Sequence, residues 1–376
     1  MSGIFYHHSF AHPKKSSIFA DMKQEIIDKI NRLASQDEPF LFVINYQEDK
    51  FFIRLLSDIN LEECLFDFEG RGNFSDSRKN DSEETLEEIS EETSEEISKE
   101  TSEETSKEIS EITWQIEPPL YEDYERSFNI VKSNIMAGNS YLTNLTCRVP
   151  VSCNLSLEDI FHRAKGKYKL LLRRNENLNP FVCFSPETFI RIKGGRIYSY
   201  PMKGTQDASL PDAEKQLMED EKEAAEHATI VDLIRNDLSR VAEDVRVDKY
   251  RYIDVLHTNK GDILQTSSEI SGRLPEDYRN HLGEILAAQL PAGSITGAPK
   301  AKTMQIIHEA EGYDRGFYTG IMGIYDQGEL NSAVMIRFIE EEDEDRLYFK
   351  AGGGITSKSD CRKEYEEVIQ KIYLPF

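Results

Sequence analysis

The sequence has few cysteines and no motif that would join them into a framework. Its 376 residues include five cysteines, an odd number, and none belongs to a Cys-x-x-Cys pair. Disulfide scaffolds and thiolate zinc sites both depend on paired cysteines at suitable spacings. We therefore predict reduced thiols in a cytoplasmic protein.

Long apolar runs and a basic surplus are missing as well. No segment approaches eighteen consecutive apolar residues, and the first residues lack the basic start and apolar stretch of a secretory signal. The 45 basic side chains are outnumbered by 69 acidic ones, which gives a formal net charge of −24. Phosphate backbones and anionic lipids repel such a chain. We expect neither nucleic acid nor a membrane as a partner.

Half of the negative charge lies in one low-complexity segment, residues 81–111. This segment carries fourteen acidic side chains against two lysines, in tetrapeptides such as Ser-Glu-Glu-Thr. A period of four does not keep apolar residues on one helix face, and glutamates four residues apart repel one another. We predict a solvated, disordered insertion. An acidic arm that binds a partner protein or calcium is the alternative interpretation.

The rest of the sequence predicts antiparallel sheets with helices outside them. Apolar spacing predicts a helix over 22–33 and paired strands over 40–45 and 50–55, which make a short α/β region within residues 1–80. Further helices are expected over 121–138, 156–165, 212–240, 279–289, 299–311 and 360–372. Further strands are expected over 141–149, 168–173, 181–184, 188–193, 196–200, 251–257, 262–271, 320–327, 330–339 and 346–351.

Two predicted helices carry glutamates at i and i+3. The pairs are Glu223 with Glu226, and Glu364 with Glu367. Because residues three apart share a helix face, each pair can offer hard oxygen ligands of the kind that Mg²⁺ binds. Glutamate pairs are also common on exposed helices, so the spacing alone leaves both interpretations open.

A glycine-rich segment, residues 351–355, reads as a turn between a strand and the second of these helices. Backbone without side chains can approach an anion and donate N–H groups to it. The spacing of a Walker loop is absent from the chain. A tight turn without a ligand is the alternative.

Other residues also have two interpretations. Lys203 lies between a proline-stiffened strand end and a predicted glycine turn, where it is either a nucleophile or a surface hairpin lysine. His257, at the end of a predicted strand, is either a core histidine or a catalytic group. Ser294 and Thr296, in a Gly-Ser-Ile-Thr-Gly turn that opens a helix, are either helix caps or substrate contacts.

Three sequence blocks stand in the order seen in chorismate-utilising enzymes. They are SYPMKGT at 199–205, EKEAAEHATIVDLIRNDL at 221–238 and GSITGAPK at 293–300. Over about residues 117–376 the chain resembles the chorismate-binding enzyme family. Within that family it is similar to aminodeoxychorismate synthase component I, the large subunit of 4-aminobenzoate synthase, which accepts ammonia.

The resemblance implies the fold of the anthranilate synthases. This is an α+β, four-layer α/β/β/α sandwich of two facing, mostly antiparallel sheets flanked by helices, with the site in the cleft between the halves. Residues 117–376 would form the chorismate-binding catalytic domain. The region 1–80 would pack on this core, and it is shorter than the N-terminal portion usual in the family.

The resemblance also implies roles for particular residues. Lys203 would add covalently to the ring, which requires an unprotonated amine, and Glu187 would protonate the departing hydroxyl, with His257 near it. Mg²⁺ would be the cofactor, bound by the two glutamate pairs. The implied substrate contacts are Thr205, Ser294, Thr296, Tyr318, Arg337, Gly352, Gly353 and Gly354.

One residue decides the branch of the family. Anthranilate synthases typically have alanine at the position of Lys203, in Pro-Ile-Ala-Gly-Thr, whereas aminodeoxychorismate synthases have Pro-Ile-Lys-Gly-Thr; this chain has Pro-Met-Lys-Gly-Thr. The resemblance therefore implies amination of chorismate to 4-amino-4-deoxychorismate. Ammonia would come from a glutamine amidotransferase subunit in a heterodimer, and an aminodeoxychorismate lyase would act next in 4-aminobenzoate and folate synthesis.

Two alternatives remain at this point. The first is another chorismate enzyme, an anthranilate, isochorismate or salicylate synthase. The second is a non-catalytic interaction protein that acts through the acidic repeat. Intact lysine and glutamate positions favour an enzyme over the second alternative.

Overall fold

The structure is a computed structural model. It describes residues 13–74, 112–174, 178–258, 261–342 and 346–376. The acidic segment 81–111 lies outside these ranges. No helix in the described ranges is long and apolar enough to cross a membrane.

The described helices follow the predicted order closely. They are α1 (Pro13–Ser35), α2 (Tyr121–Met136), α3 (Leu157–Arg163), α4 (Ala213–Glu219), α5 (Glu221–Leu238), α6 (Leu282–Gln289), α7 (Lys300–Glu311) and α8 (Cys361–Gln370). Short 3₁₀ helices are η1 (Leu56–Asp58), η2 (Tyr278–His281) and η3 (Gly293–Ile295). The single helix predicted over 212–240 is two helices, because Asp220 has an extended backbone between α4 and α5.

The strands include several short ones that the sequence pattern did not predict. They are β1 (Phe40–Ile44), β2 (Phe51–Leu55), β3 (Cys64–Phe68), β4 (Arg71–Gly72), β5 (Trp114–Ile116), β6 (Leu142–Cys153), β7 (Tyr168–Leu172), β8 (Phe181–Ser185), β9 (Thr188–Lys193), β10 (Arg196–Ser199), β11 (Met202–Asp207), β12 (Glu243–Thr258), β13 (Gly261–Arg273), β14 (Gly297–Ala298), β15 (Ile321–Asp326), β16 (Glu329–Val334), β17 (Phe338–Glu342) and β18 (Arg346–Ile355).

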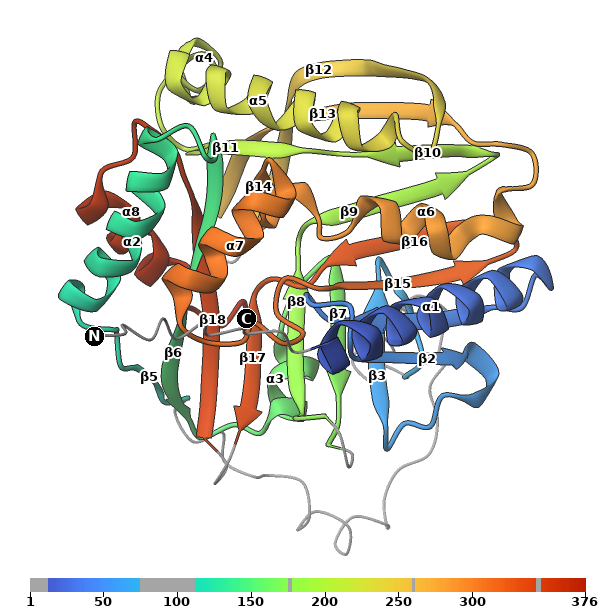
Figure 1. The fold of residues 1–376 in the computed structure, drawn as a ribbon. Helices are drawn as coiled ribbons and strands as arrows, with labels where there is room; N and C mark the ends of the chain where they lie inside the picture. The colour runs from blue at the N-terminus through green and yellow to red at the C-terminus, as the bar shows by residue number, and fades with distance from the viewer. Residues whose placement is uncertain (1–12, 75–111, 175–177, 259–260, 343–345) are drawn as a thin grey trace, which may run out of the picture.

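These strands form two antiparallel sheets (Figure 1). The first sheet has the order β11-β13-β10-β9-β16-β15-β1-β2, with β12 also paired to β13. The second has the order β14-β6-β18-β17-β8-β7-β3-β4, with β5 paired to β6. The N-terminal strands β1 and β3 each join a sheet built mainly from later residues, since β1 pairs with β15 and β3 with β7.

Three apolar cores separate four layers of structure. In the first core, α1, α5 and α6 pack on the outer face of the first sheet. In the second, α2, α3, α7 and α8 pack on the outer face of the other sheet. The third core lies between the two sheets and contains residues of β1, β3, β7, β8 and β17. The predicted four-layer α/β/β/α sandwich is therefore confirmed.

The chain crosses from one sheet to the other within the segment predicted as one strand over 330–339. It is divided into β16, in the first sheet, and β17, in the second. Arg337 lies at the crossing with a positive φ of 55°. This left-handed backbone redirects the chain, so no continuous strand can form there.

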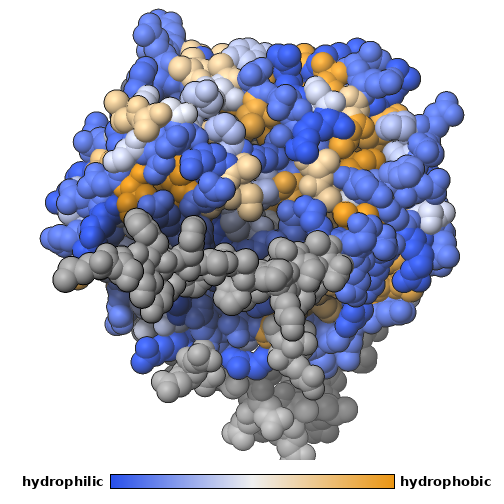
Figure 2. All heavy atoms as spheres, viewed as in Figure 1, coloured by the Kyte–Doolittle hydropathy of each residue, from blue (hydrophilic) through white to orange (hydrophobic). Residues whose placement is uncertain are grey.

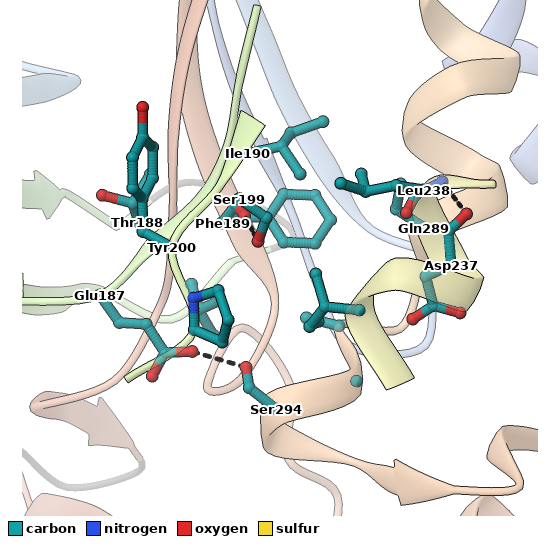
Figure 3. A pocket seen from close by; sticks show the side chains of 15 residues that line it. Glu187, Thr188, Phe189, Ile190, Ser199, Tyr200, Asp237, Leu238, Gln289 and Ser294 are labelled. Carbon is teal, nitrogen blue, oxygen red and sulfur yellow. Dashed lines mark hydrogen bonds between the residues drawn. The ribbon is translucent and has the colours of Figure 1, made fainter. Parts of the chain in front are cut away.

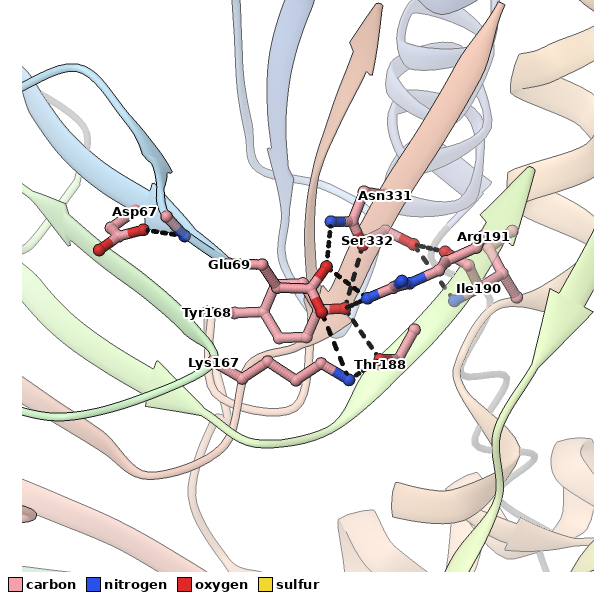
Figure 4. A network of polar contacts seen from close by, with 10 residues as sticks. Asp67, Glu69, Lys167, Tyr168, Thr188, Ile190, Arg191, Asn331 and Ser332 are labelled. Carbon is pink, nitrogen blue, oxygen red and sulfur yellow. Dashed lines mark hydrogen bonds and ion pairs between the residues drawn. The ribbon is translucent and has the colours of Figure 1, made fainter. Parts of the chain in front are cut away.

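A polar cluster joins the two sheets (Figure 4). The Glu69 carboxylate, just after β3, pairs with Arg191 of β9 and accepts a hydrogen bond of 2.9 Å from Asn331 of β16. Lys167 lies 3.7 Å from the same carboxylate, and the Tyr168 hydroxyl receives a 3.0 Å hydrogen bond from Arg191. These contacts stabilise the packing of the sheets at the surface of the central core.

Figure 2 shows that hydrophilic residues predominate on the visible face of the molecule.

Candidate active site

Lys203 lies on an edge strand. β11 pairs with β13 beyond the point where β10 ends its pairing with the same strand. The sequence predicted a glycine turn here, but Gly204 instead forms an irregularity within β11, with a φ of +77°. A Cβ at Gly204 would lie 2.9 Å from Oε2 of Glu223. Glycine therefore lets this strand approach α5 closely.

The ammonium of Lys203 lies among carboxylates. Its Nζ is 3.0 Å from Oε2 of Glu226. Burial lowers the pKa of Lys203, but the charges of Glu226, Glu223 and Glu367 outweigh burial and hold that pKa above its ordinary value. The amine is thus protonated in the free protein, which differs from the unprotonated amine that a nucleophile requires.

The first glutamate pair stands at the start of α5. The side chain of Asp220 caps this helix by accepting a 2.8 Å hydrogen bond from the backbone N–H of Glu223. Burial, and then the neighbouring charge of Glu226, raise the pKa of Glu223. The cap fixes where the helix begins, and thereby the direction in which the pair points.

The second glutamate pair, Glu364 and Glu367, lies on the other side of strand β18 from Lys203. Residues 352–354 are not a turn, as the sequence suggested, but the end of β18, paired with residues 144–146 of β6. A Cβ at Gly353 would lie 3.6 Å from Oε2 of Glu364, and one at Gly354 would lie 3.8 Å from Nζ of Lys203. Because neither glycine has a side chain, the strand leaves room for Glu364 on one face and for Lys203 on the other.

The two carboxylates on α8 differ in their electrostatics. Burial raises the pKa of Glu364, and the charge of Glu367 adds to this effect. Burial also acts to raise the pKa of Glu367, but Lys371, 2.8 Å away, brings it below its ordinary value. Lys371 also donates a 3.0 Å hydrogen bond to the carbonyl of Gly352. Sequence reasoning missed this lysine, although its position four residues after Glu367 on the helix could have indicated it.

Lys203 interacts electrostatically with all four predicted metal ligands. The charges of Glu223, Glu226 and Glu367 act on Lys203, and the charge of Lys203 acts on Glu364. In the described ranges, no three acidic, histidine or cysteine side chains stand close enough together to hold an ion. Mg²⁺ prefers carboxylate oxygens, retains waters and is often bound together with its substrate. The carboxylate oxygens of the four glutamates are chemically suited to Mg²⁺, but these side chains would have to approach one another more closely to hold it.

Glu187 lies beside a small cavity (Figure 3). Its Oε1 accepts a 2.5 Å hydrogen bond from the hydroxyl of Ser294, and its backbone N–H donates to the hydroxyl of Ser185 at 3.1 Å. Burial raises the pKa of Glu187, while Ser294 and the charge of Lys203 oppose the rise. The net effect favours a protonated carboxyl, which can act as an acid.

The other predicted substrate contacts lie on several different elements. The Arg337 guanidinium donates a 3.2 Å hydrogen bond to the carbonyl of Lys371 and lies 5.1 Å from the Tyr373 ring centre. Tyr318 and Thr296 are buried, whereas Thr205 is exposed on β11. His257 lies on β12 opposite Asp262, and its side chain is outside the described part of the structure.

Comparison with known proteins identifies the family. The family model described as chorismate binding enzyme matches residues 6–375. An uncharacterized PabA-like protein of Haemophilus influenzae is 46% identical over 352 residues, which are 94% of this chain and 97% of the relative. The chain belongs to the chorismate binding enzyme family.

More distant relatives have names that suggest particular activities. Aminodeoxychorismate synthase component 1 of Salmonella typhimurium is 32% identical over 66% of this chain and 56% of its own. The crystal structure of anthranilate synthase component I from Streptococcus pneumoniae is 27% identical, with a TM-score of 0.58, and the match covers 69% of this chain and 58% of that one.

Proposed function

We propose that the protein is a cytoplasmic aminodeoxychorismate synthase component I, which converts chorismate and ammonia to 4-amino-4-deoxychorismate. The observation that carries the proposal is the position of Lys203, next to two glutamate pairs and within electrostatic reach of Glu187. Every residue of the proposed site lies within 117–376, which we assign as the catalytic domain. Residues 1–80 would support it by packing on its sheets.

Glu187 is the proposed general acid. It gives its proton to the 4-hydroxyl of chorismate, which then leaves as water. Burial raises the pKa of this carboxyl above its ordinary value, which is the direction that a general acid requires. Ser294 holds the carboxyl in one orientation through its 2.5 Å hydrogen bond.

Lys203 is the proposed nucleophile. Its amine forms a bond to the ring as the hydroxyl departs, and ammonia then forms the new C–N bond while the amine of Lys203 leaves with its bonding electrons. Before this step, the ammonium must separate from Glu226 and lose a proton. His257 would assist near the leaving hydroxyl.

The remaining residues bind and orient the substrate. Arg337, with Tyr318 and the backbone of residues 352–354, would hold a carboxylate of chorismate, because a guanidinium binds carboxylate in a bidentate manner. Ser294, Thr296 and Thr205 would contact the rest of the substrate. Glu223, Glu226, Glu364 and Glu367 would hold Mg²⁺, which when bound orients the substrate and neutralises part of its charge.

The partner we propose is a separate glutamine amidotransferase subunit, which would supply ammonia in a heterodimer. A lyase would then release pyruvate from the product to give 4-aminobenzoate for folate synthesis.

Product analysis tests the proposal. Purified protein is incubated with chorismate, Mg²⁺ and an ammonium salt, with and without an added aminodeoxychorismate lyase, and the products are separated by chromatography. We expect 4-aminobenzoate only when the lyase is present, and loss of this product in Lys203→Ala. Anthranilate would favour the activity named for the Streptococcus pneumoniae relative, and isochorismate or salicylate another branch of the family.

A further inference from the structure

A chain of buried hydrogen bonds links the backbone of Lys203 to α5. The hydroxyl of Thr266 on β13 donates to the carbonyl of Lys203. The ring of His227 on α5 lies between two hydroxyl groups. Its Nδ1 is 3.5 Å from the hydroxyl oxygen of Thr266, and its Nε2 is 2.7 Å from the hydroxyl oxygen of Ser268. The side chains of Thr266, His227 and Ser268 are fully buried. Buried polar groups that satisfy one another hold a single arrangement.

A β-bulge brings Arg251 into the same network. Between the pairs Lys249–Glu269 and Tyr252–Ser267, two residues of β12 stand opposite one residue of β13. That single residue is Ser268, whose hydroxyl accepts a 2.9 Å hydrogen bond from the backbone N–H of Arg251.

The backbone of Arg251 has a positive φ of 47° within this bulge. Such a conformation is costly for a residue with a side chain, and it persists where surrounding contacts enforce it. A bulge also changes the direction in which a side chain points. The side chain of Arg251 is accordingly buried rather than exposed with the neighbouring residues of the strand.

The guanidinium of Arg251 binds the corner between α4 and α5. It donates to the carbonyls of Met218 at 2.7 Å, Leu217 at 2.8 Å and Asp220 at 3.4 Å. One planar group thus satisfies the end of α4 and contacts the residue that caps α5. The first turns of α5 carry Glu223 and Glu226.

We propose that Arg251 is a positioning residue that sets the place of the Glu223–Glu226 pair relative to Lys203. The bulge connects Arg251 to the strand that carries Lys203. The hydroxyl of Ser268 accepts a hydrogen bond from Arg251, and the backbone N–H of Ser268 donates to the carbonyl of Pro201, two residues before Lys203. Arg251 touches neither substrate nor metal in this assignment. The inference rests on the proposed magnesium site.

The variant Arg251→Lys tests the proposal, because lysine keeps the charge but cannot bind three carbonyls with a planar fork. Binding of Mn²⁺, used as a probe for Mg²⁺, is measured by electron paramagnetic resonance of the free ion with saturating chorismate and without ammonium salt. We expect Mn²⁺ affinity to fall about 10-fold or more, as for other residues that orient metal ligands. The Mg²⁺ concentration for half-maximal product formation should rise in parallel.

The control is Arg246→Lys, an exposed arginine of the same strand that pairs with Asp248. It should leave Mn²⁺ affinity unchanged. Ser268→Ala, which removes the hydroxyl at the bulge, should act like Arg251→Lys and serves in its place if that variant does not fold. A variant that unfolds at lower temperature but binds Mn²⁺ as tightly as the wild type would overturn the proposal and leave Arg251 a stability role only.

A second comparison separates this inference from the proposed function. If Glu226→Gln leaves Mn²⁺ binding unchanged, the proposed metal site is wrong and the role of Arg251 is overturned with it. If Glu226→Gln weakens binding and Arg251→Lys does not, only the role of Arg251 is overturned.

Discussion

At the scale of single residues, the chemistry depends on two groups with opposite electrostatic needs. Glu187 must carry a proton near neutral pH, and its buried position raises its pKa in that direction. Lys203 must lose a proton, and its acidic neighbours raise its pKa in the unfavourable direction. The free protein therefore shifts the pKa of Glu187 in the direction that the proposed mechanism requires and the pKa of Lys203 in the opposite direction.

Replacing Glu187 with glutamine should remove the acid but preserve the shape. The amide can still accept the hydrogen bond from Ser294, so we expect normal folding and chorismate binding. The value of kcat should fall by about 10²–10⁴-fold, the usual contribution of general acid catalysis. Steady-state kinetics with saturating Mg²⁺ and ammonium measure kcat, and an unchanged kcat would exclude Glu187 as the acid.

At the scale of elements, helix α6 approaches α1 closely because its second residue, Gly283, lies in the contact. A Cβ at Gly283 would lie 2.5 Å from the carbonyl oxygen of Ile27 and 2.7 Å from its Cα. The backbone N–H of Gly283 also donates a 2.7 Å hydrogen bond to the side chain of Asn31. The N-terminal helix is thus held on the rest of the fold by backbone contact as well as by apolar packing.

Gly283→Ala should destabilise the protein by about 1–3 kcal/mol, the usual cost of forcing extra atoms into a packed contact. Urea denaturation followed by circular dichroism would show a lower midpoint. The obstructing atoms belong to the backbone, so shortening Ile27 to alanine should not restore stability in the double variant. Restoration would mean that side-chain crowding, rather than helix contact, sets the distance.

The polar cluster that joins the two sheets predicts a dependence of stability on pH. Burial acts to raise the pKa of Glu69, but hydrogen bonding and the charge of Arg191 outweigh it and lower that pKa below its ordinary value of 4.5. A carboxylate with a lowered folded pKa stabilises the fold above about pH 4.5, and this contribution is lost as the pH falls through the folded pKa.

We therefore expect Glu69→Gln to be less stable than the wild type at neutral pH, by no more than about 1 kcal/mol because the pair is partly exposed. Melting temperatures measured from pH 7 to pH 3 should converge below pH 4.5. Glu309→Gln, at an exposed position of α7, is the matched control and should follow the wild type throughout. A constant difference between Glu69→Gln and the wild type at all pH values would contradict the assignment.

At the scale of the whole molecule, the proposed site depends on both sheets. Lys203 belongs to the edge strand of one sheet and the glycines at residues 352–354 belong to the other, while α5 and α8 bring the glutamates from the two outer layers. The groups meet only when all four layers are assembled. Activity should therefore be lost together with the global fold.

The acidic segment 81–111 supplies none of the proposed groups. Its deletion should leave kcat and the KM for chorismate within about twofold of the wild-type values, and the same product assay measures both. A deleted protein that keeps its melting temperature but loses activity would instead support a working role for the repeat. If the deleted protein also failed to bind an amidotransferase subunit, the role of the repeat would be to dock this partner.

The sequence by itself determined the order and type of most elements. Apolar periodicity predicted α1, α2, α7 and α8 and most strands of both sheets, because burial on one face leaves a local pattern in the residues. The motifs around Lys203 and at 293–300 identified the family, which implied the four-layer fold. Spacing also placed each glutamate pair on one face of a helix.

Only the tertiary structure decided where the elements break and what they approach. Arg251, which is distant in the sequence, donates a hydrogen bond to the carbonyl of Asp220 at the break between α4 and α5. The crossing at Arg337 depends on two sheets facing each other. The glycines at 352–354 are strand rather than turn because β6 lies beside them. Such contacts join distant segments, so no local pattern encodes them, and the ionisation of Lys203 and Glu187 depends on the same contacts.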